Sequence, residues 1–250
     1  MGISRAWMLS ALLRLSLLWR TLAELGLICC NFALHSKSSK TRLLNEYNSH
    51  PKGLSFVVIG MNDEKSPLFP DEVRRLISEH RIFSGGRRHR ELVGELLPEG
   101  AVWIDIVVPL SDVYTQYRHY DEPVLVFASG DPLFFGFTTT LMREFEGRVT
   151  KTFPSFSSLQ MLAHALRLPY HDMRVVSLTG RPWHEFDRAL IERAHKVGVL
   201  TDRKYTPATI AKRMLDYGYT AYRMHIGVLL GGEREETYSL PLEEVVTKDF

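Results

Sequence analysis

The sequence has very little cysteine. Only two of its 250 residues are cysteines, Cys29 and Cys30, and they are adjacent. Adjacent cysteines build neither a disulfide framework nor a thiolate metal site, so we expect a reducing, cytoplasmic environment. The C-x-x-C, H-E-x-x-H and G-x-x-x-x-G-K-[ST] patterns are also missing, which excludes these signatures of zinc and P-loop sites. The ten histidines form no ligand set, and we expect no protein-bound metal.

Strong charge of one sign is missing too. The formal net charge of +2 is too mild to favour nucleic acid as a partner on its own. With 45% hydrophobic and 24% charged residues, the composition is that of an ordinary globular protein. The length allows one large domain or two modest ones.

Residues 1–53 read as an extension of the folded protein. A segment rich in Leu and Trp, residues 7–34, is interrupted by Arg14, Arg20 and Glu24. Its uncharged runs are too short to span a bilayer, and it lacks the apolar core and cleavage site of a signal peptide. We therefore expect no stable membrane span and a poorly ordered extension. An amphipathic helix on a membrane surface is the alternative.

From Leu54 onward, strand-like and helix-like segments alternate, which is typical of an α/β fold with a largely parallel sheet. We expect a first α/β lobe over residues 54–147 and a second over residues 148–250. Thr206-Pro207 predicts a helix start, with Thr as the cap and Pro at the first position. Two strand-like runs joined through Gly231-Gly232 indicate an antiparallel hairpin. The expected strands are residues 55–60, 81–84, 101–108, 123–128, 148–153, 174–178, 196–201, 222–230 and 235–240.

The most informative segment is Phe127-Ala-Ser-Gly-Asp-Pro-Leu-Phe-Phe-Gly136. It follows an apolar run and precedes a helix expected from about residue 134 to residue 145. A strand that ends in Ser-Gly-Asp-Pro opens a loop at the carboxyl edge of a sheet, where open α/β sheets bind ligands. Gly130 lets the backbone approach a bound molecule, Asp131 offers acceptor oxygens, and Pro132 stiffens the turn.

This loop and others along the chain resemble, in order, those of the tetrapyrrole methylase superfamily. Within it, the chain is most similar to the branch of precorrin-6Y and cobalt-precorrin-7 C-5-methyltransferases of cobalamin biosynthesis. The resemblance covers Leu54 to about Val246. The segments that carry it are Ile59–Asp63, Ala128–Gly136, Pro154–Ser158, Val175–Pro182, Val199–Asp202 and Thr206–Ala208.

The resemblance implies a two-lobed α/β enzyme with a mostly parallel sheet in the first lobe and a mixed sheet in the second. It also implies S-adenosylmethionine bound in the cleft between the lobes, and a homodimer. The family's first loop is usually Gly-x-Gly-Pro-Gly-Asp, whereas here it is Gly60-Met-Asn-Asp63, so no cofactor contact is assigned to residues 61 and 62. Carried over position by position, the cofactor-binding residues would be Gly60, Ser129, Gly130, Asp131, Phe134, Ser157, Ser158 and Thr201.

The activity implied is C-methylation at C-5 of a (cobalt-)precorrin. In methyl transfer the cofactor carries the electrophile, and the protein supplies binding and orientation. No general base is assigned. Asp131 is a candidate for a direct chemical role, although ordering the cofactor is the better interpretation. Nothing resembles the decarboxylating domain that follows in many relatives, so methylation at C-15 would need another polypeptide or a part of the chain not given.

A corrin precursor bears many carboxylates, so cationic groups should line the cleft. The segment Gly85-Gly-Arg-Arg-His-Arg90 places cations at a helix amino terminus, where the macrodipole disfavours them. A broken local rule often marks a site. We therefore predict that Arg87, Arg88 and Arg181 bind the substrate. A solvated basic first turn is the structural alternative.

Two other functions remain open at this point. The first is an RNA or protein methyltransferase of the same superfamily. RNA would require a basic stripe with interleaved aromatics, and only residues 87–90 come close, so we expect no nucleic acid. The second is a non-catalytic assembly subunit, which the altered first loop allows.

Overall fold

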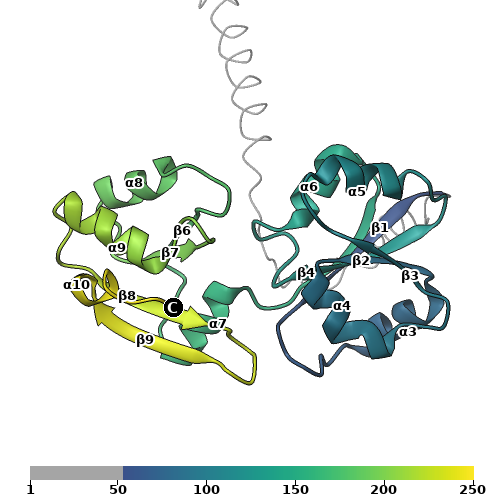
Figure 1. The fold of residues 1–250 in the computed structure, drawn as a ribbon, viewed down its shortest axis with the longest axis horizontal. Helices are drawn as coiled ribbons and strands as arrows, with labels where there is room; N and C mark the ends of the chain where they lie inside the picture. Colours follow the sequence, from purple (N-terminus) through teal and green to yellow (C-terminus); the bar gives the residue numbers. More distant parts are fainter. Residues whose placement is uncertain (1–52) are drawn as a thin grey trace, which may run out of the picture. The chain divides into compact units, whose positions relative to one another are not determined.

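A computed structural model of the chain describes residues 53–250 (Figure 1). The predicted extension, with its alternatives of poor order and of a membrane-surface helix, lies outside the described residues but for Gly53. The first elements in chain order are β1 (Ser55–Met61), α3 (Asp71–Glu79), β2 (Ile82–Gly85), α4 (Arg87–Val93), a 3₁₀ turn (Gly94–Leu96), β3 (Val102–Asp105), α5 (Leu110–Tyr117), β4 (Pro123–Ser129), α6 (Phe137–Glu144) and β5 (Val149–Phe153). They are followed by α7 (Ser158–Leu166), β6 (Arg174–Ser177), α8 (His184–Ile191), β7 (Val197–Leu200), α9 (Pro207–Asp216), β8 (Arg223–Val228), β9 (Glu236–Pro241) and α10 (Leu242–Val245).

The first five strands form one parallel sheet in the order β3-β2-β4-β1-β5. The chain moves along the sheet one way from β1 through β2 to β3, and the opposite way from β3 through β4 to β5. Because crossovers between parallel strands are right-handed, this reversal places helices on both faces. Figure 1 shows α3 and α4 on one face and α5 and α6 on the other. The α/β prediction with a parallel first sheet is confirmed.

The reversal has a direct consequence at the centre of the sheet. Strands β1 and β4 are neighbours, yet the chain leaves β1 toward β2 and leaves β4 toward β5. Loops that leave adjacent strands in opposite directions open a crevice at the carboxyl ends of those strands. The loops that begin at Met61 and at Ser129 flank this crevice.

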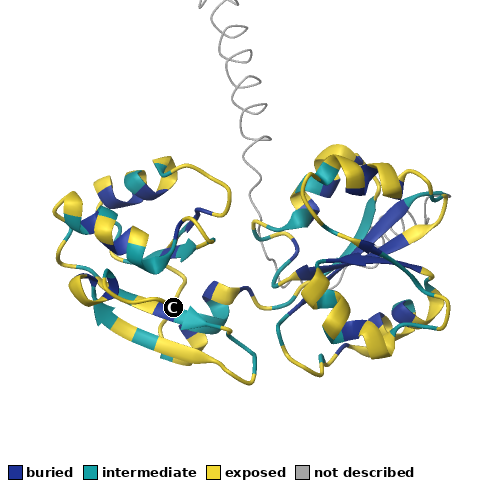
Figure 2. Ribbon diagram, viewed as in Figure 1, coloured by how far each residue is buried: buried dark blue, intermediate teal, exposed yellow. Residues whose placement is uncertain are grey.

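Burial of the sheet explains why its central strands are almost wholly apolar. Every residue of β1 is buried, as are the five central residues of β4 (Figure 2). A parallel sheet covered on both faces requires such continuous apolar strands. One face packs against Val113 and Leu141 of α5 and α6, and the other against Val73 and Ile77 of α3. Full burial of each such side chain contributes roughly 1.5–3 kcal/mol.

The second half of the chain has its own core and two small sheets. Strands β6 and β7 are parallel, and β8 and β9 form the antiparallel hairpin predicted from Gly231-Gly232. Strands of both orientations are thus present, divided between two sheets. Thr206 caps α9 by accepting from the Thr209 N–H (3.2 Å), with Pro207 at the first position, so the predicted helix start is confirmed.

The structure differs from the sequence-based expectations in three places. The strand Val149–Phe153, expected in the second lobe, pairs with β1 in the first sheet, so the first sheet extends past the boundary expected at residue 147. The helix expected from residue 134 begins at Phe137, because Phe135 has a left-handed φ of 57°. The strand expected over residues 101–108 ends at Asp105. None of the helices within residues 53–250 has the length and the apolar composition that a bilayer span requires.

Candidate active site

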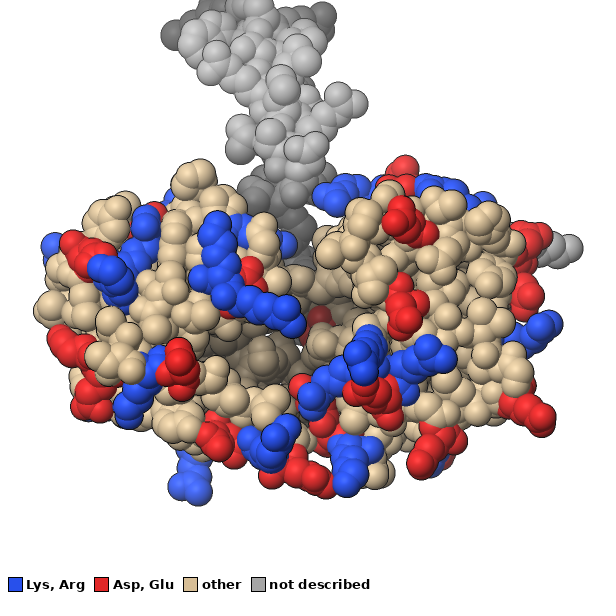
Figure 3. All heavy atoms as spheres, viewed as in Figure 1, with Lys and Arg blue, Asp and Glu red and all other residues tan. Residues whose placement is uncertain are grey.

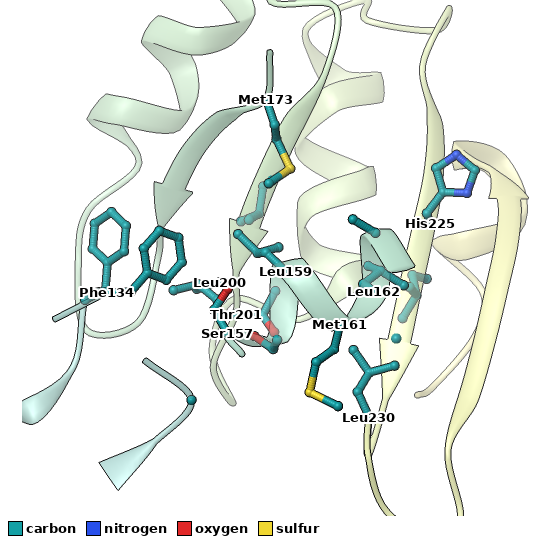
Figure 4. Close-up of a pocket in the computed structure, with 18 of the residues that line it drawn as sticks. Phe134, Ser157, Leu159, Met161, Leu162, Met173, Leu200, Thr201, His225 and Leu230 are labelled. Carbon is teal, nitrogen blue, oxygen red and sulfur yellow. The ribbon is translucent and has the colours of Figure 1, made fainter. Parts of the chain in front are cut away.

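A cavity of about 1100 Å³ lies against the carboxyl edge of the first sheet and the elements that follow β5. In the space-filling view a hollow opens on this face of the protein, with Lys and Arg side chains on both sides of it (Figure 3). The close-up shows Phe134 near one end, Ser157 and Thr201 beside Leu159 in the middle, and Met161 and Leu230 farther along (Figure 4). The cavity therefore combines polar groups from loops with an apolar wall.

Three loops meet tightly beside the cavity, and Gly60 is the residue that lets them do so. A Cβ atom at Gly60 would lie 2.2 Å from the Gly130 carbonyl oxygen, 2.8 Å from Pro132 Cδ and 2.8 Å from the Ser155 nitrogen. Side chains never approach backbone atoms so closely, so only glycine fits here. Gly60 itself does not line the cavity. Its close contacts are with the other two loops, and its contact with a cofactor stays a prediction.

The loop after β4 is shaped by glycine and by an aspartate turn. Gly130 has a φ of 64°, and its N–H donates to the Met61 carbonyl (2.8 Å). The Asp131 carboxylate accepts from the Leu133 N–H (2.9 Å), which fixes the side chain in a turn beside its own backbone. Ser129, Gly130, Asp131 and Phe134 all line the cavity, and their binding of a cofactor stays a prediction.

The altered first loop takes part in the same assembly. The Met61 carbonyl accepts from the Gly130 N–H, and the Asn62 Oδ1 accepts from the Ser155 hydroxyl (3.0 Å). Asp63 accepts from Arg88 Nε (2.6 Å) and so joins this loop to α4. Met61, Asn62 and Asp63 line the cavity. Met61 and Asn62, which depart from the glycine-rich pattern, thus hold the neighbouring loops in place.

The two serines predicted at the start of α7 have different roles. Ser157 is the N-cap: its Oγ accepts from the Gln160 N–H (3.3 Å), and its own N–H donates to Gln160 Oε1 (2.9 Å). This reciprocal pair is a capping box. Ser158, the first helical residue, is exposed and also lines the cavity. The Ser157 hydroxyl is engaged by the helix, which leaves the Ser158 hydroxyl as the better placed ligand-binding group of the two.

Thr201 lies on the cavity wall beside a carboxylate that ties two loops together. The Thr201 carbonyl accepts from the Thr179 hydroxyl (3.2 Å). Next to it, Asp202 accepts from the N–H groups of Gly180 (2.9 Å), Tyr205 (2.8 Å) and Lys204 (2.8 Å). The Gly180 and Tyr205 donors hold the pKa of Asp202 below its ordinary value. Thr201 therefore lines the cavity, and Asp202 holds the two loops together.

In the basic segment at the start of α4, His89 lines the cavity, whereas the neighbouring Arg87 and Arg88 do not. Arg87 pairs with Glu91 on its own helix (3.1 Å), and Arg88 is held by Asp63. Arg181 stacks over the ring of Phe135, with 4.9 Å between the guanidinium carbon and the ring centroid. Phe135 lines the cavity, whereas Arg87, Arg88 and Arg181 do not. Binding of a substrate by these arginines stays a prediction.

His89, by contrast, is half-buried and lines the cavity. Its Nε2 lies 2.9 Å from Ser129 Oγ, and its Nδ1 lies 3.1 Å from the Gly86 nitrogen. Burial lowers the pKa of His89; Asp63 partly opposes this shift and Arg88 adds to it. Sequence reasoning noted His89 only as part of a basic segment. Its partner Ser129 lies on another strand, so the pairing had no signal in the local sequence.

Within residues 53–250, no group of three or more His, Cys, Asp or Glu side chains is placed to hold a metal ion. All the predicted cofactor-binding residues except Gly60 lie on the cavity. The apolar part of the wall was not predicted. It includes Leu159, Leu162 and Met173.

The sequence of the chain is similar to those of several known methyltransferases. A sequence model of the tetrapyrrole (corrin/porphyrin) methylases matches residues 57–246. Over 192 residues, the chain is 33% identical to a precorrin-6Y C(5,15)-methyltransferase [decarboxylating] of a Sinorhizobium species, covering 75% of this chain and 46% of that protein. It is 30% identical to the cobalt-precorrin-7 C(5)-methyltransferase of Salmonella typhimurium, covering 75% of this chain and 91% of the relative. The chain thus spans about half of the first relative and nearly all of the second.

The fold also matches a solved structure that contains a ligand. The uroporphyrin-III C-methyltransferase of Thermus thermophilus, in complex with S-adenosyl homocysteine, superposes with a TM-score of 0.54 at 22% identity. The match covers 77% of this chain and 85% of that one. At this level of identity the likeness establishes the fold.

Proposed function

Because the chain belongs to the family of tetrapyrrole (corrin/porphyrin) methylases, we propose that it is an S-adenosylmethionine-dependent C-methyltransferase acting at C-5 of a (cobalt-)precorrin in cobalamin biosynthesis. The observation that carries this proposal is the match to the Salmonella cobalt-precorrin-7 C(5)-methyltransferase across 91% of its length. The Sinorhizobium relative supports the same substrate class. An RNA or protein substrate and a purely structural role are less well supported, because neither accounts for these matches.

The residues of the cavity fit S-adenosylmethionine. Ligand sites of this class are mostly apolar and carry a few placed polar groups, with volumes of roughly 300–1,000 Å³. The cavity here has about 1100 Å³, an apolar wall from Leu159, Leu162 and Met173, and polar groups on the loops. Asp131 would hold the ammonium group, the backbone at Gly130 would lie along the methionine part, and Thr201 would touch the adenosine part.

When bound, S-adenosylmethionine supplies a methyl group on a sulfonium, so the protein needs no nucleophile of its own. The interlocked loops around Gly60 fix the shape of the cavity and thereby the relative orientation of the two reactants. Such positioning can supply roughly 7–11 kcal/mol of the barrier. The apolar wall favours a reaction in which a cationic methyl donor becomes neutral, since an uncompensated charge is costly in apolar surroundings.

Recognition of the substrate would rest on cationic side chains around the hollow seen in Figure 3. Arg181 is the best supported of the three predicted arginines, because it stacks on Phe135 at the cavity wall. Arg88 is held by Asp63, and 51% of its side chain remains exposed and able to meet a carboxylate. Arg87 is farthest from this role, since 92% of its side chain is exposed and its partner is on the same helix.

Three further parts of the proposal come from the cysteine content and from the resemblance. We propose a cytoplasmic homodimer, with each chain carrying one cavity. Methylation at C-15 with decarboxylation would need another polypeptide or a part of the chain not given. Sedimentation of the purified chain measures its oligomeric state directly, and a monomer at micromolar concentration would contradict the homodimer.

The function is tested with the full chain in two steps. Calorimetric titration with S-adenosylhomocysteine should show saturable binding that Asp131→Ala weakens, with Asp216→Ala on the surface of α9 as the control. Incubation of the chain with cobalt-precorrin-7 and S-adenosylmethionine carrying a ¹³C-labelled methyl group should then give a product labelled at C-5 by NMR. A folded chain that binds no S-adenosylhomocysteine would refute the methyltransferase assignment. Binding of the cofactor product without labelling at C-5 would refute the choice of substrate.

A further inference from the structure

The pair His89–Ser129 has a feature that the proposed methyl transfer does not by itself require. Each ring nitrogen of His89 has one partner: Gly86 N–H at Nδ1 and the Ser129 hydroxyl at Nε2. A ring nitrogen that accepts a hydrogen bond carries no proton. Because the backbone N–H of Gly86 can only donate, Nδ1 must be the unprotonated nitrogen, and the neutral ring carries its proton on Nε2.

This tautomer decides the direction of the next hydrogen bond. With the proton on Nε2, His89 donates to Ser129 Oγ across 2.9 Å. The Ser129 hydroxyl proton is then directed away from the ring. Among the described residues, Ser129 Oγ has no other hydrogen-bond partner, and Ser129 lies on the cavity. Its proton is therefore available to a molecule in the cavity.

The base of the His89 side chain packs closely against the end of β2. Gly85, the last residue of β2, is buried, and a Cβ there would lie 3.1 Å from the His89 Cβ and 3.0 Å from the Trp103 ring. Burial keeps the ring neutral near neutral pH, since it lowers the pKa of His89; the facing charges are Asp63 and Arg88. The orientation of the hydroxyl is thus set by backbone and packing and does not depend on the ligand.

We propose that His89 is a positioning residue that fixes Ser129 as a hydrogen-bond donor to a carboxylate bound in the cavity. The inference rests on the proposed function, in which two molecules carry carboxylates: the amino-acid part of the cofactor and the acidic side chains of the tetrapyrrole. With one lone pair of Ser129 Oγ occupied by the His89 N–H, the hydroxyl proton stays free for an acceptor in the cavity, so this position favours a carboxylate.

Two substitutions separate this role from the histidine's contact with the helix amino terminus. His89→Asn keeps an oxygen near the place of Nδ1, where it accepts from Gly86 N–H, but it does not reach Ser129. His89→Gln places an amide N–H near the place of Nε2 and gives up the contact with Gly86. A merely structural role predicts that the Gln variant is the more damaged. The proposed role predicts weaker ligand binding in the Asn variant, whose melting temperature should stay near that of the wild type.

The test is calorimetric titration of the full chain and its variants with three probes: S-adenosylhomocysteine, methylthioadenosine and uroporphyrin III. Methylthioadenosine lacks the amino-acid part, whereas uroporphyrin carries carboxylates on a tetrapyrrole ring. Ser129→Ala and His89→Asn should each weaken one carboxylate-bearing probe about tenfold, and the double variant should lose no more than Ser129→Ala alone. Ser78→Ala on the outer side of α3 is the control and should bind every probe as the wild type does.

The pattern across probes identifies the source of the carboxylate. Loss for S-adenosylhomocysteine with unchanged methylthioadenosine assigns it to the cofactor, and loss for uroporphyrin alone assigns it to the substrate. Unchanged affinity for every probe, or losses that add in the double variant, would overturn the inference and leave the proposed function standing. A wild-type chain that binds none of the probes would overturn both.

A spectroscopic measurement tests the tautomer without any ligand. Long-range ¹H–¹⁵N spectra of the imidazole rings, assigned with His89→Asn, should show His89 with its proton on Nε2 near neutral pH. Its titration should fall below the ordinary histidine value of about 6.5. A proton on Nδ1 would overturn the inference whatever the binding results.

Discussion

Replacing Gly60 with alanine should be far more damaging than its position outside the cavity suggests. The added Cβ would lie 2.2 Å from the Gly130 carbonyl oxygen and 2.8 Å from both Pro132 Cδ and the Ser155 nitrogen. Ordinary carbon contacts are about 3.5–4.0 Å, so the loops after β1, β4 and β5 would have to separate. Overpacking costs about 1–3 kcal/mol when side chains can yield, and two of these three neighbours are backbone atoms. We expect a loss of about 3 kcal/mol, at the upper end of that range.

A loss of this size should be easy to measure. For a chain of this length, each kcal/mol lowers the melting temperature by about 2–4 °C, so Gly60→Ala should melt about 6–12 °C below the wild type. Circular dichroism during heating measures this, and calorimetry should show weakened binding of S-adenosylhomocysteine in the part of the sample that remains folded. The control is Gly94→Ala, since Gly94 has helical dihedral angles and no atom within 4 Å of its Cβ position. Equal melting temperatures for the two variants would refute the assignment of Gly60 to loop packing.

Three further predictions concern stability. Ser157→Ala removes the N-cap of α7 and should cost about 1 kcal/mol, or about 2–4 °C in a thermal shift assay; no change would contradict the cap. Tyr117→Phe removes the buried bond between the phenol and Ser84 Oγ (2.6 Å), and should cost about 1 kcal/mol at neutral pH. Because burial raises the pKa of Tyr117, its contribution is present below about pH 10 and is lost as pH rises further, so urea unfolding should show the wild type losing more stability than the variant above that pH. Asp202→Ala should lower the melting temperature more than Asp216→Ala. Because the pKa of Asp202 is lowered, this difference should be present above about pH 4 and should fade as the pH falls below it. Equal melting temperatures at neutral pH would contradict the role of Asp202 in holding the loops together.

The parts of the fold that the sequence predicted well are those that depend on neighbouring residues. Alternating strands and helices, the cap at Thr206 and the hairpin through Gly231-Gly232 each follow from a short stretch of chain. The sheet to which a strand belongs does not. Val149–Phe153 was correctly predicted as a strand and wrongly placed in the second lobe, because its partner β1 is far away in the sequence.

The candidate site shows the same division. The loop residues Ser129 to Asp131 were found because a strand ending in Ser-Gly-Asp-Pro has a local meaning. The sequence predicted Gly60 as a cofactor-binding residue. The structure shows that two loops distant in the sequence pack closely against it. The contact of His89 with Ser129 joins residues on α4 and β4. No pattern of spacing within either element predicts it.

The meeting of three loops at Gly60 also bears on how the protein comes to be assembled during its synthesis. The atoms that meet there belong to residues 60, 130 and 155, so this contact is complete only after the fifth strand has left the ribosome. Contacts between distant segments form late, because the intervening chain must first be closed into a loop. A nascent chain that ends before residue 155 can fold local helices but lacks the third loop around Gly60. The ability to bind a ligand should therefore arise in the growing chain well after its first secondary structure.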